Sequence, residues 1–337
     1  MKNRYCQLYS FLFILFFLSS CEPEELINNG NTAVSDQQIS SKNTSFSSVT
    51  VNEETLYGGR SAHSSTVFNK KMWLIGGIEN QTTFNDVWCS EDGLNWKAIN
   101  PSANFDPRYG HAMTSTKNRM WIVGGMQGAN LYNDVWQSKN GKEWVQATAN
   151  GPFSPRRYHT FTSFNGRMFL IGGRSQATIN GDVWVTDGND WNLITNLAPF
   201  GRRYGHATVV YNNRIWVIGG IDQNNNYLND VWYSDNGFVW NLASPNTQFS
   251  PRRHHAVTAN EKGMWLTAGV GPSHNYFNDI WFSQDGIAWE LVNVKETFSP
   301  RAYHSSMYFD EKLWVLNGFR VNINAPNDYY DDVWGYN

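Results

Sequence analysis

The sequence predicts an all-β protein that forms a six-bladed β-propeller, with four antiparallel strands in each blade. A motif recurs six times along the chain at a spacing of 47 to 49 residues. Each copy has room for four short strands, and the last copy ends before its fourth strand. Four strands per period of about 45–50 residues are typical of a propeller blade, so one repeat architecture accounts for most of the chain.

The motif begins with an arginine, and a histidine follows three residues later. The arginines are Arg60, Arg108, Arg156, Arg203, Arg252 and Arg301, and the histidines are His63, His111, His159, His206, His255 and His304. A pair of small residues, such as Gly76-Gly77, begins thirteen residues after each histidine. An Asp-aliphatic-Trp unit follows, whose acids are Asp86, Asp134, Asp182, Asp230, Asp279 and Asp332. Six copies in register establish the repeat.

The strands of one copy can be assigned within residues 206–240. Residues 206–210 form the first predicted strand, and the aliphatic and aromatic residues 215–218 form the second. The third strand carries the unit at 230–232, and the fourth begins at Trp240. A longer polar loop separates the second strand from the third. Alternation of polar turns with short apolar segments favours strands over helices throughout.

The turn before each fourth strand contains an Asp-Gly or Asn-Gly pair. These pairs are Asp92-Gly93, Asn140-Gly141, Asp187-Gly188, Asn236-Gly237 and Asp285-Gly286. Such pairs suit two-residue type I′ turns, in which both residues have positive φ. We therefore expect a two-residue β-hairpin at this point of the first five copies.

The two ends of the chain predict how the ring closes. The last copy stops at Asn337, just after Trp334, and lacks a fourth strand. Residues 46–51 alternate in polarity as a strand does. We expect this segment to supply the outer strand of the sixth blade, which would leave no free sheet edge.

The N-terminus has the features of an export signal. Lys2 and Arg4 precede an apolar run at 11–18, which is too short to span a bilayer. The sequence that ends at Cys21 resembles a bacterial lipobox, so residues 1–20 are expected to be removed and Cys21 to carry lipid. An ordinary secretory signal with a chance cysteine is the alternative. The acidic stretch 22–25 resembles the export mark of some surface lipoproteins, and a solvated linker would look the same.

The resemblance implies a protein held in the bacterial cell envelope by lipid alone, at the outer membrane and on either of its surfaces. Residues 21–45 are rich in Asn, Ser, Thr, Gln and Glu, and we expect a flexible tether there. Residues 46–337 are the expected propeller. Of three cysteines, Cys89 alone would stay free within it, so no intramolecular disulfide is expected. A net charge of −3 without a basic run argues against a nucleic-acid partner.

The paired glycines after an aliphatic strand, the aromatic third strand and the spaced tryptophan together resemble the kelch repeat. The resemblance covers residues 46–337. In this region the chain resembles bacterial proteins of the galactose oxidase/kelch-like superfamily. It implies a propeller that is closed by strands from both chain ends. It also implies that an arginine near the first strand can hold an acidic partner, as kelch domains do.

The repeated residues have a structural explanation. All 16 tryptophans occupy repeat positions on second, third and fourth strands, which predicts packing between blades. Arginine and aspartate of one copy are expected on the same side of a blade, where they could form ion pairs. A ring of free arginines around the channel mouth is the alternative. The histidines lie on different blades, so no metal site is expected.

Function is expected in the residues that vary between copies. The two residues after each repeated arginine should point into the channel mouth, together with the loops that follow the second strands. The predicted ligand-binding residues are Tyr109, Arg157, Tyr158, Tyr204, Arg253, His254, Tyr303, Arg174 and Arg320. Tyrosine can stack on a sugar ring, and arginine can bind a carboxylate through two hydrogen bonds. A protein or glycan ligand is therefore expected at the mouth.

Two function classes stay open. The first is a binding module without a cofactor, and the sequence favours it because no paired catalytic carboxylates, nucleophile elbow or phosphate loop is present. The second is a carbohydrate enzyme of the sialic acid mutarotase type, which six-bladed kelch proteins include. Its candidate residues are Arg157, Arg253, Glu79 and Asp222. A copper enzyme of the galactose oxidase type is rejected, because it requires seven blades and a Cys–Tyr crosslink.

Overall fold

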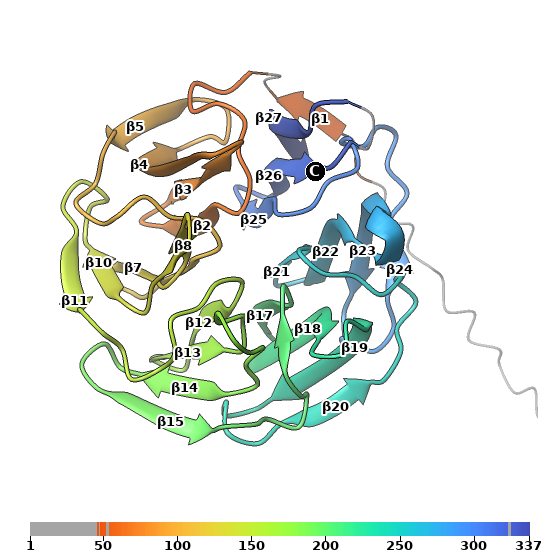
Figure 1. The fold of residues 1–337 in the computed structure, drawn as a ribbon. Coiled ribbons are helices and arrows are strands. Elements are labelled where there is room, and N and C mark those ends of the chain that lie inside the picture. Colours follow the sequence, from red (N-terminus) through yellow and green to blue (C-terminus); the bar gives the residue numbers. More distant parts are fainter. Residues whose placement is uncertain (1–45, 47, 52–53, 323–324) are drawn as a thin grey trace, which may run out of the picture. The chain divides into compact units, whose positions relative to one another are not determined.

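The computed structural model describes residue 46 and residues 48–51, 54–322 and 325–337. The predicted signal at 1–20 and the predicted tether at 21–45 lie outside these residues. Within the described part, six antiparallel sheets are arranged around a central axis, and each contains four main strands (Figure 1). The predicted six-bladed propeller is therefore confirmed.

The first three blades follow the chain from the innermost strand outward. Blade 1 contains β2 (Ser64–Phe68), β3 (Lys71–Glu79), β4 (Thr82–Ser90) and β5 (Trp96–Asn100). Blade 2 contains β6 (Ala112–Ser115), β7 (Met120–Val123), β10 (Val135–Ser138) and β11 (Val145–Thr148). The loop between β7 and β10 carries a short ribbon of β8 (Met126–Gln127) and β9 (Asn130–Leu131). Blade 3 contains β12 (Thr160–Phe164), β13 (Arg167–Ile171), β14 (Val183–Thr186) and β15 (Trp191–Thr195).

The last three blades repeat this order. Blade 4 contains β17 (Ala207–Tyr211), β18 (Arg214–Asp222), β19 (Tyr227–Ser234) and β20 (Asn241–Ser244), and β16 (Arg203–Tyr204) pairs with the end of β18. Blade 5 contains β21 (Ala256–Asn260), β22 (Gly263–Val270), the short 3-10 helix η1 (Pro272–His274), β23 (Tyr276–Ser283) and β24 (Glu290–Leu291). Blade 6 contains β25 (Ser305–Phe309), β26 (Lys312–Arg320) and β27 (Asp328–Tyr336).

The N-terminal strand β1 (Ser48–Val51) completes blade 6, as predicted. It pairs antiparallel with β27, with Ser48 opposite Tyr336 and Val51 opposite Val333. Because β27 runs away from the channel mouth, β1 starts at the opposite face and runs toward the mouth. Phe46 bridges to Val294 of blade 5 and packs its ring 4.7 Å from that of Trp265. The chain therefore enters the propeller at the face opposite the mouth.

One ion pair in each blade joins the repeated arginine to the repeated aspartate. The six N–O distances are 2.5 to 2.8 Å, and no arginine is more than 1% exposed. Arg108 also donates to the carbonyl of Gly124, and Trp136 Nε1 donates to the same carboxylate as Arg108, that of Asp134. The predicted ion pairs are confirmed, and the alternative of a free arginine ring is excluded for these six residues.

The small-residue pairs adopt a left-handed backbone at both positions in every blade. In blade 1, Gly76 and Gly77 have φ of 59° and 103°. A Cβ atom on Gly77 would lie 2.9 Å from the Cβ of His63, so the pair must be small to let the inner strand approach. In blade 6, Asn317 takes the first position and donates to the carbonyls of Gly58 and Tyr330.

The predicted two-residue turns are wrong. In blade 1, five residues separate β4 from β5, and only the glycine of the Asp92-Gly93 pair has positive φ. The carboxylate of Asp92 accepts hydrogen bonds from the backbone N–H groups of Leu94 and Asn95, while Ser90 Oγ accepts from Gly93 N. The side chains thus build a wider loop than a type I′ turn allows.

Each of these hairpin loops packs on an aromatic side chain of the preceding blade. Gly141 of blade 2 lies against Trp73 of blade 1, and Gly237 of blade 4 lies against Phe169 of blade 3. The second-strand aromatic residues are all buried. This confirms the predicted role of the aromatic residues in packing between blades.

Candidate functional site

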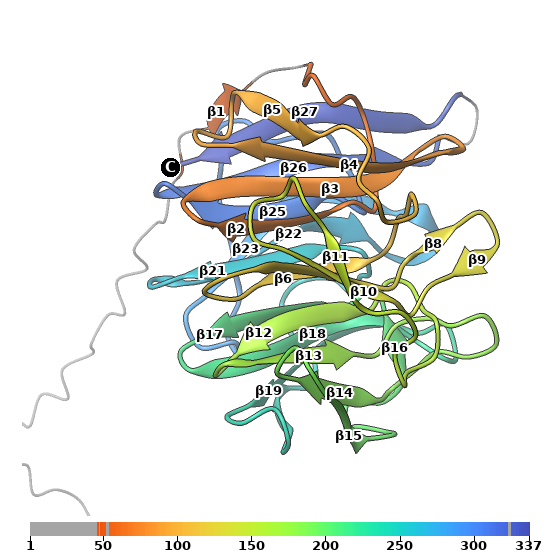
Figure 2. The ribbon, with the colours of Figure 1, turned by 90° about the vertical axis from the view of Figure 1, so that its left-hand side faces the viewer.

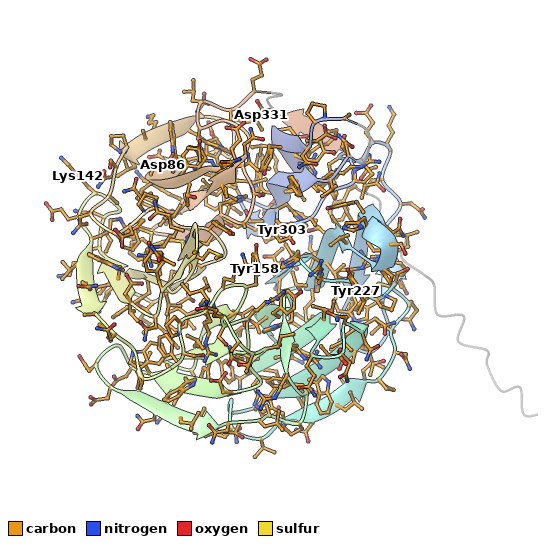
Figure 3. The ribbon with its side chains drawn as sticks, in the orientation of Figure 1. Asp86, Lys142, Tyr158, Tyr227, Tyr303 and Asp331 are labelled. Atoms are coloured by element: carbon orange, nitrogen blue, oxygen red, sulfur yellow. The ribbon has the colours of Figure 1, made fainter. Side chains whose placement is uncertain are left out.

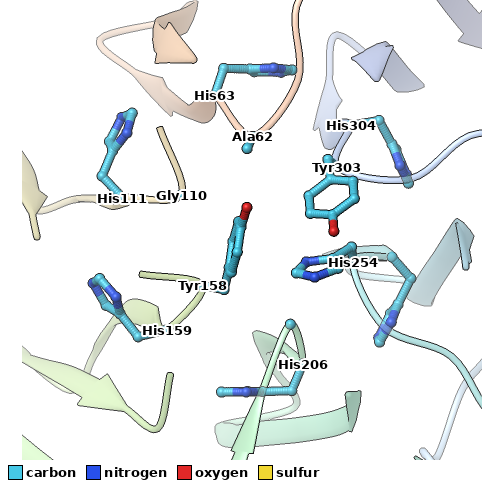
Figure 4. A pocket seen from close by; sticks show the side chains of 12 residues that line it. Ala62, His63, Gly110, His111, Tyr158, His159, His206, His254, Tyr303 and His304 are labelled. Atoms are coloured by element: carbon cyan, nitrogen blue, oxygen red, sulfur yellow. The ribbon is translucent and has the colours of Figure 1, made fainter. Parts of the chain in front are cut away.

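A closed ring of six residues lines the channel mouth. These residues each lie two positions after a repeated arginine, and they are Ala62, Gly110, Tyr158, Gly205, His254 and Tyr303. The backbone N–H of each donates to the carbonyl of its neighbour in the preceding blade, at 2.7 to 3.0 Å. All six have φ between 52° and 63°. We call this set the mouth ring, and Figure 4 shows it with its side chains directed toward the axis.

Three members of the mouth ring are large, although the left-handed conformation favours small residues. Tyr158, His254 and Tyr303 hold this conformation, which costs a residue with a Cβ about 1 kcal/mol or more. Blades 1, 2 and 4 use alanine or glycine at the same place. Strain of this kind persists where surrounding structure enforces it, often at functional sites. The three rings therefore are the first candidates for contact with a ligand.

The three large side chains pack together across the channel. His254 stacks on Tyr303 with 3.8 Å between ring centroids, and its edge faces Tyr158 at 4.6 Å. Burial, with help from the Arg253 charge, holds the pKa of His254 well below its usual value. Burial also raises the pKa of Tyr303 to about 12. At neutral pH the cluster consequently presents neutral hydroxyl and imidazole groups.

The repeated histidines form a second layer of the channel, beneath the mouth ring. Residues of both layers line an open cavity of about 130 Å³. Burial and the neighbouring arginine lower the pKa of His63, His159 and His255 to about 3, so these rings are neutral.

Hydroxyl groups of neighbouring blades bind some of the histidines. Ser64 Oγ lies 2.6 Å from His111 Nε2, and Ser305 Oγ lies 2.9 Å from His63 Nε2. The residue equivalent to Ser64 is alanine in blades 2, 4 and 5, so the pattern is incomplete. In the described residues, no three His, Cys, Asp or Glu side chains are grouped as metal ligands. The histidines that bind a hydroxyl group thereby link two neighbouring blades.

Two arginines flank the aromatic cluster. Arg157 donates to Tyr109 Oη at 3.1 Å, contacts Met126 Sδ, and lies over the Tyr158 ring at 5.0 Å. Arg253 donates to Tyr204 Oη at 2.6 Å, and lies over the Tyr227 ring at 5.5 Å. Within the described part of the chain, neither guanidinium forms an ion pair with a carboxylate, in contrast to the six repeated arginines.

Seven of the nine predicted site residues come together in this cluster: Tyr109, Arg157, Tyr158, Tyr204, Arg253, His254 and Tyr303. Figure 3 places Tyr158 and Tyr303 at the centre of the ring of blades. Arg174 adjoins the cluster, because its backbone pairs with that of Arg157 and its guanidinium lies 5.6 Å from the Tyr204 ring. Arg320 is exposed at the end of β26, opposite Asp328, and has no contact with the cluster.

The sequence analysis did not single out Met126 and Tyr227, which contact the two arginines. Met126 lies in β8, in a segment between second and third strands that was expected to reach the mouth, and Tyr227 is the first residue of the third strand β19. Met126 pairs with Tyr109 in the structure, a bridge that no spacing in the sequence indicates. For Tyr227 no sequence pattern indicates the contact with Arg253.

The two candidate carboxylates of the enzyme alternative lie at the ends of second strands. Asp222 closes its own loop: Oδ1 accepts from the backbone N–H groups of Asn224 and Asn226, and Oδ2 accepts from Asn226 Nδ2. Glu79 ends β3, across the strand pair from Thr82. Asp222 is thus occupied by structural hydrogen bonds.

Among the residues that the structure describes, no helix is long and apolar enough to cross a membrane. The chain is also similar to a solved structure described as "Structure of YjhT", with 15% identity and a TM-score of 0.66 over 84% of this chain and 96% of that one. This likeness supports the fold alone. A search of curated proteins found no match.

The family comparison covers nearly the whole propeller. A model described as the KLHDC2/KLHL20/DRC7 Kelch-repeats domain matches residues 31–173, 92–202 and 187–337. These matches agree with the repeated arginines, glycine pairs and tryptophans of all six blades. The chain therefore belongs to the KLHDC2/KLHL20/DRC7 kelch-repeat domain family.

Proposed function

We propose that the protein is a binding module whose channel mouth takes a ligand with a carboxylate group, carried by a glycan or a protein outside the cell. The observation that carries this proposal is the contrast between two sets of arginines. Arg108 and its five equivalents are neutralised by aspartate, whereas Arg157 and Arg253 have no acidic partner among the described residues. A partly buried guanidinium without a counter-charge favours an anion.

The surroundings of the two arginines suit such a ligand. Hydroxyls of Tyr109 and Tyr204 hold the guanidinium groups in place, and charge-assisted bonds of this kind reduce the entropy lost on binding. The faces and edges of Tyr158 and Tyr303 offer apolar contact to a sugar ring or a peptide side chain. Since burial keeps Tyr158, Tyr303 and His254 neutral, the positive charge of the site comes from the arginines.

The proposal includes export and attachment by lipid at Cys21. Support comes from the sequence of residues 1–21 and from the direction of β1, which starts at the face opposite the mouth. An anchored chain would thereby leave the mouth free to meet a ligand. Growth of the expressing cells with a clickable fatty acid tests this point. We expect labelled protein from the wild type and none from Cys21→Ala.

The ligand proposal is tested with the full chain in detergent on an array of neutral and acidic glycans and peptides. We expect binding only to carboxylate-bearing ligands, and at least about a tenfold loss in the double variant Arg157→Ala/Arg253→Ala. The control is Lys139→Ala/Lys142→Ala, which removes the same charge from an exposed hairpin of blade 2; Figure 3 shows Lys142 at the rim.

Two outcomes would contradict the proposal. Wild-type binding by the arginine double variant would show that Arg157 and Arg253 do not form the binding site. An equal loss of binding in the lysine control would show that binding depends only on the net charge of the protein. A parallel assay of sialic acid anomer interconversion decides the enzyme alternative. If the wild type shows turnover and Glu79→Gln does not, the protein is an enzyme and the binding-module hypothesis is wrong.

A further inference from the structure

A second polar pocket lies beside the mouth, between loops of blades 3 and 4. Its volume is about 410 Å³, within the range of roughly 300–1,000 Å³ that small-molecule sites occupy. Guanidinium, amide and hydroxyl groups dominate its lining, from Arg174, Gln176, Thr178, Arg202, Gln223 and Asn225. Typical small-molecule pockets are mostly apolar, so this composition favours a strongly hydroxylated ligand over an apolar one.

The pocket carries positive charge without internal compensation. In the described part of the chain, neither Arg174 nor Arg202 forms an ion pair with a carboxylate. Arg202 Nη1 donates to the carbonyl of Ile179 at 3.1 Å, which fixes the side chain across the pocket. In the adjacent loop, the carboxylate of Asp222 accepts hydrogen bonds from the backbone N–H groups of Asn224 and Asn226 and from the side-chain amide of Asn226.

The pocket is continuous with the mouth cluster. Arg174 and Arg157 exchange backbone hydrogen bonds at 2.8 and 3.0 Å, so their Cα atoms lie opposite each other. The ring of Tyr204 lies between the two sites, 5.6 Å from the guanidinium of Arg253 and 5.6 Å from that of Arg174. A ligand can therefore extend from the mouth into the pocket along one row of arginines.

We propose that this pocket is a second subsite, and that the ligand of the mouth is an acidic oligosaccharide with a carboxylate on successive sugar units. This inference rests on the proposed function and narrows it to one ligand class. One carboxylate binds at Arg157 and Arg253, and the next binds at Arg174 and Arg202. The amides and hydroxyls of the pocket bind the sugar hydroxyls, which are more numerous on each unit of an oligosaccharide than polar groups are on each residue of an acidic peptide.

Calorimetric titration of the full chain with galacturonic acid and with its di-, tri- and tetramers tests the inference. The wild type is expected to bind the oligomers at least about tenfold more tightly than the monomer. Arg202→Ala, which leaves Arg174 beside the mouth cluster intact, should bring the oligomers close to the affinity of the monomer and leave monomer binding unchanged. Lys142→Ala serves as the control of equal charge, and hexaglutamate as the peptide probe.

The outcomes separate the second subsite from the mouth. Equal affinity for monomer and oligomers in the wild type overturns the subsite and leaves the mouth in place. Wild-type oligomer binding by Arg202→Ala also overturns it. If hexaglutamate binds and the uronates do not, the assignment of the ligand to acidic oligosaccharides is wrong. Binding of hexaglutamate to the Arg157→Ala/Arg253→Ala variant then shows whether the peptide occupies the mouth. Absence of binding to every probe overturns the second subsite, while the array of acidic glycans and peptides decides the mouth proposal separately.

Discussion

Each repeated arginine is the centre of a buried polar network. Arg108 donates to both oxygens of Asp134 and to the carbonyl of Gly124, and the ring of Phe105 covers its guanidinium at 5.5 Å. Such a network stabilises little over an apolar replacement, but the loss of one partner leaves an uncompensated charge. Six networks of this kind fix each inner strand to the third strand of its own blade, and they thereby set the shape of the blade.

We predict that Asp134→Asn lowers the free energy of unfolding by about 3–5 kcal/mol, since Arg108 then stays charged and buried without its counter-ion. Urea unfolding followed by tryptophan fluorescence measures the change. Asp235→Asn is the control, because its exposed pair with Arg214 should contribute at most about 1 kcal/mol. Equal effects of the two substitutions would show that burial of the pair is irrelevant.

The repeat made these networks predictable, whereas the site needed the structure. Arg108 and Asp134 recur in equivalent places, and equivalent places in six copies imply contacts that the fold requires. The stacking of His254 on Tyr303 joins residues that are unique to blades 5 and 6. Their contact depends on a left-handed backbone that turns both rings to the axis, and no spacing in the sequence indicates it. The same limit applies to Arg320, which lies at the exposed end of β26 and outside the cluster.

At the scale of elements, the hairpin before each fourth strand links neighbouring blades. The Asp-Gly and Asn-Gly pairs correctly predicted a hairpin at this point, but they predicted a loop that is too short. Asn140 Oδ1 accepts hydrogen bonds from the backbone N–H groups of Lys142 and Glu143. These local hydrogen bonds widen the loop, and the preference of Asn-Gly pairs for two-residue turns does not take them into account. The glycine is needed for two reasons: its φ is 75°, and the Trp73 ring of the preceding blade lies against it.

The substitution Gly141→Ala should separate these two reasons. A Cβ atom at this position would lie 2.1 Å from Trp73 Cζ3, so we predict a loss of about 2–4 kcal/mol from clash and backbone strain together. Gly166→Ala is a matched control, because Gly166 has the same φ of 75° and no atom near its missing Cβ. There we expect about 1–2 kcal/mol from strain alone. Urea unfolding measures both, and equal losses would remove the interblade contact from the explanation.

At the scale of the whole molecule, the ring is closed by strands from both chain ends. Blades 1 to 5 are continuous in sequence, while blade 6 takes β25, β26 and β27 from the C-terminus and β1 from the N-terminus (Figure 2). The absence of a fourth strand after Trp334 made this closure predictable. Phe46 also occupies the place on Trp265 that a hairpin would occupy in another blade.

Removal of residues 44–52 should therefore lower the melting temperature and expose the edge of β27. The lost strand uncovers the backbone groups of four paired residues and the contact of Phe46 with Trp265. We expect a shift of several degrees, since a loss of 1 kcal/mol moves the melting temperature of a chain this large by about 2 °C. A deletion of residues 24–42 is the control. An unchanged melting temperature after the first deletion would contradict closure by β1.

The channel links the stability of the whole ring to pH. Its six histidines and His254 all have a pKa below the ordinary value, with burial as the largest cause. The unfolded chain therefore binds more protons than the folded chain once the pH falls below about 6.5. Stability should be complete above this pH and should decline toward pH 3, which is about the folded pKa of His63, His159 and His255.

The expected slope is up to about 1.4 kcal/mol per pH unit for each histidine that is neutral in the folded state and charged in the unfolded state. We predict that His159→Gln reduces the slope between pH 6 and pH 4 by about this amount, whatever its effect at neutral pH. The exposed His274→Gln is the control and should leave the slope unchanged. Urea unfolding at a series of pH values measures the slopes, and identical slopes in the wild type and His159→Gln would mean that the channel accepts protons without unfolding.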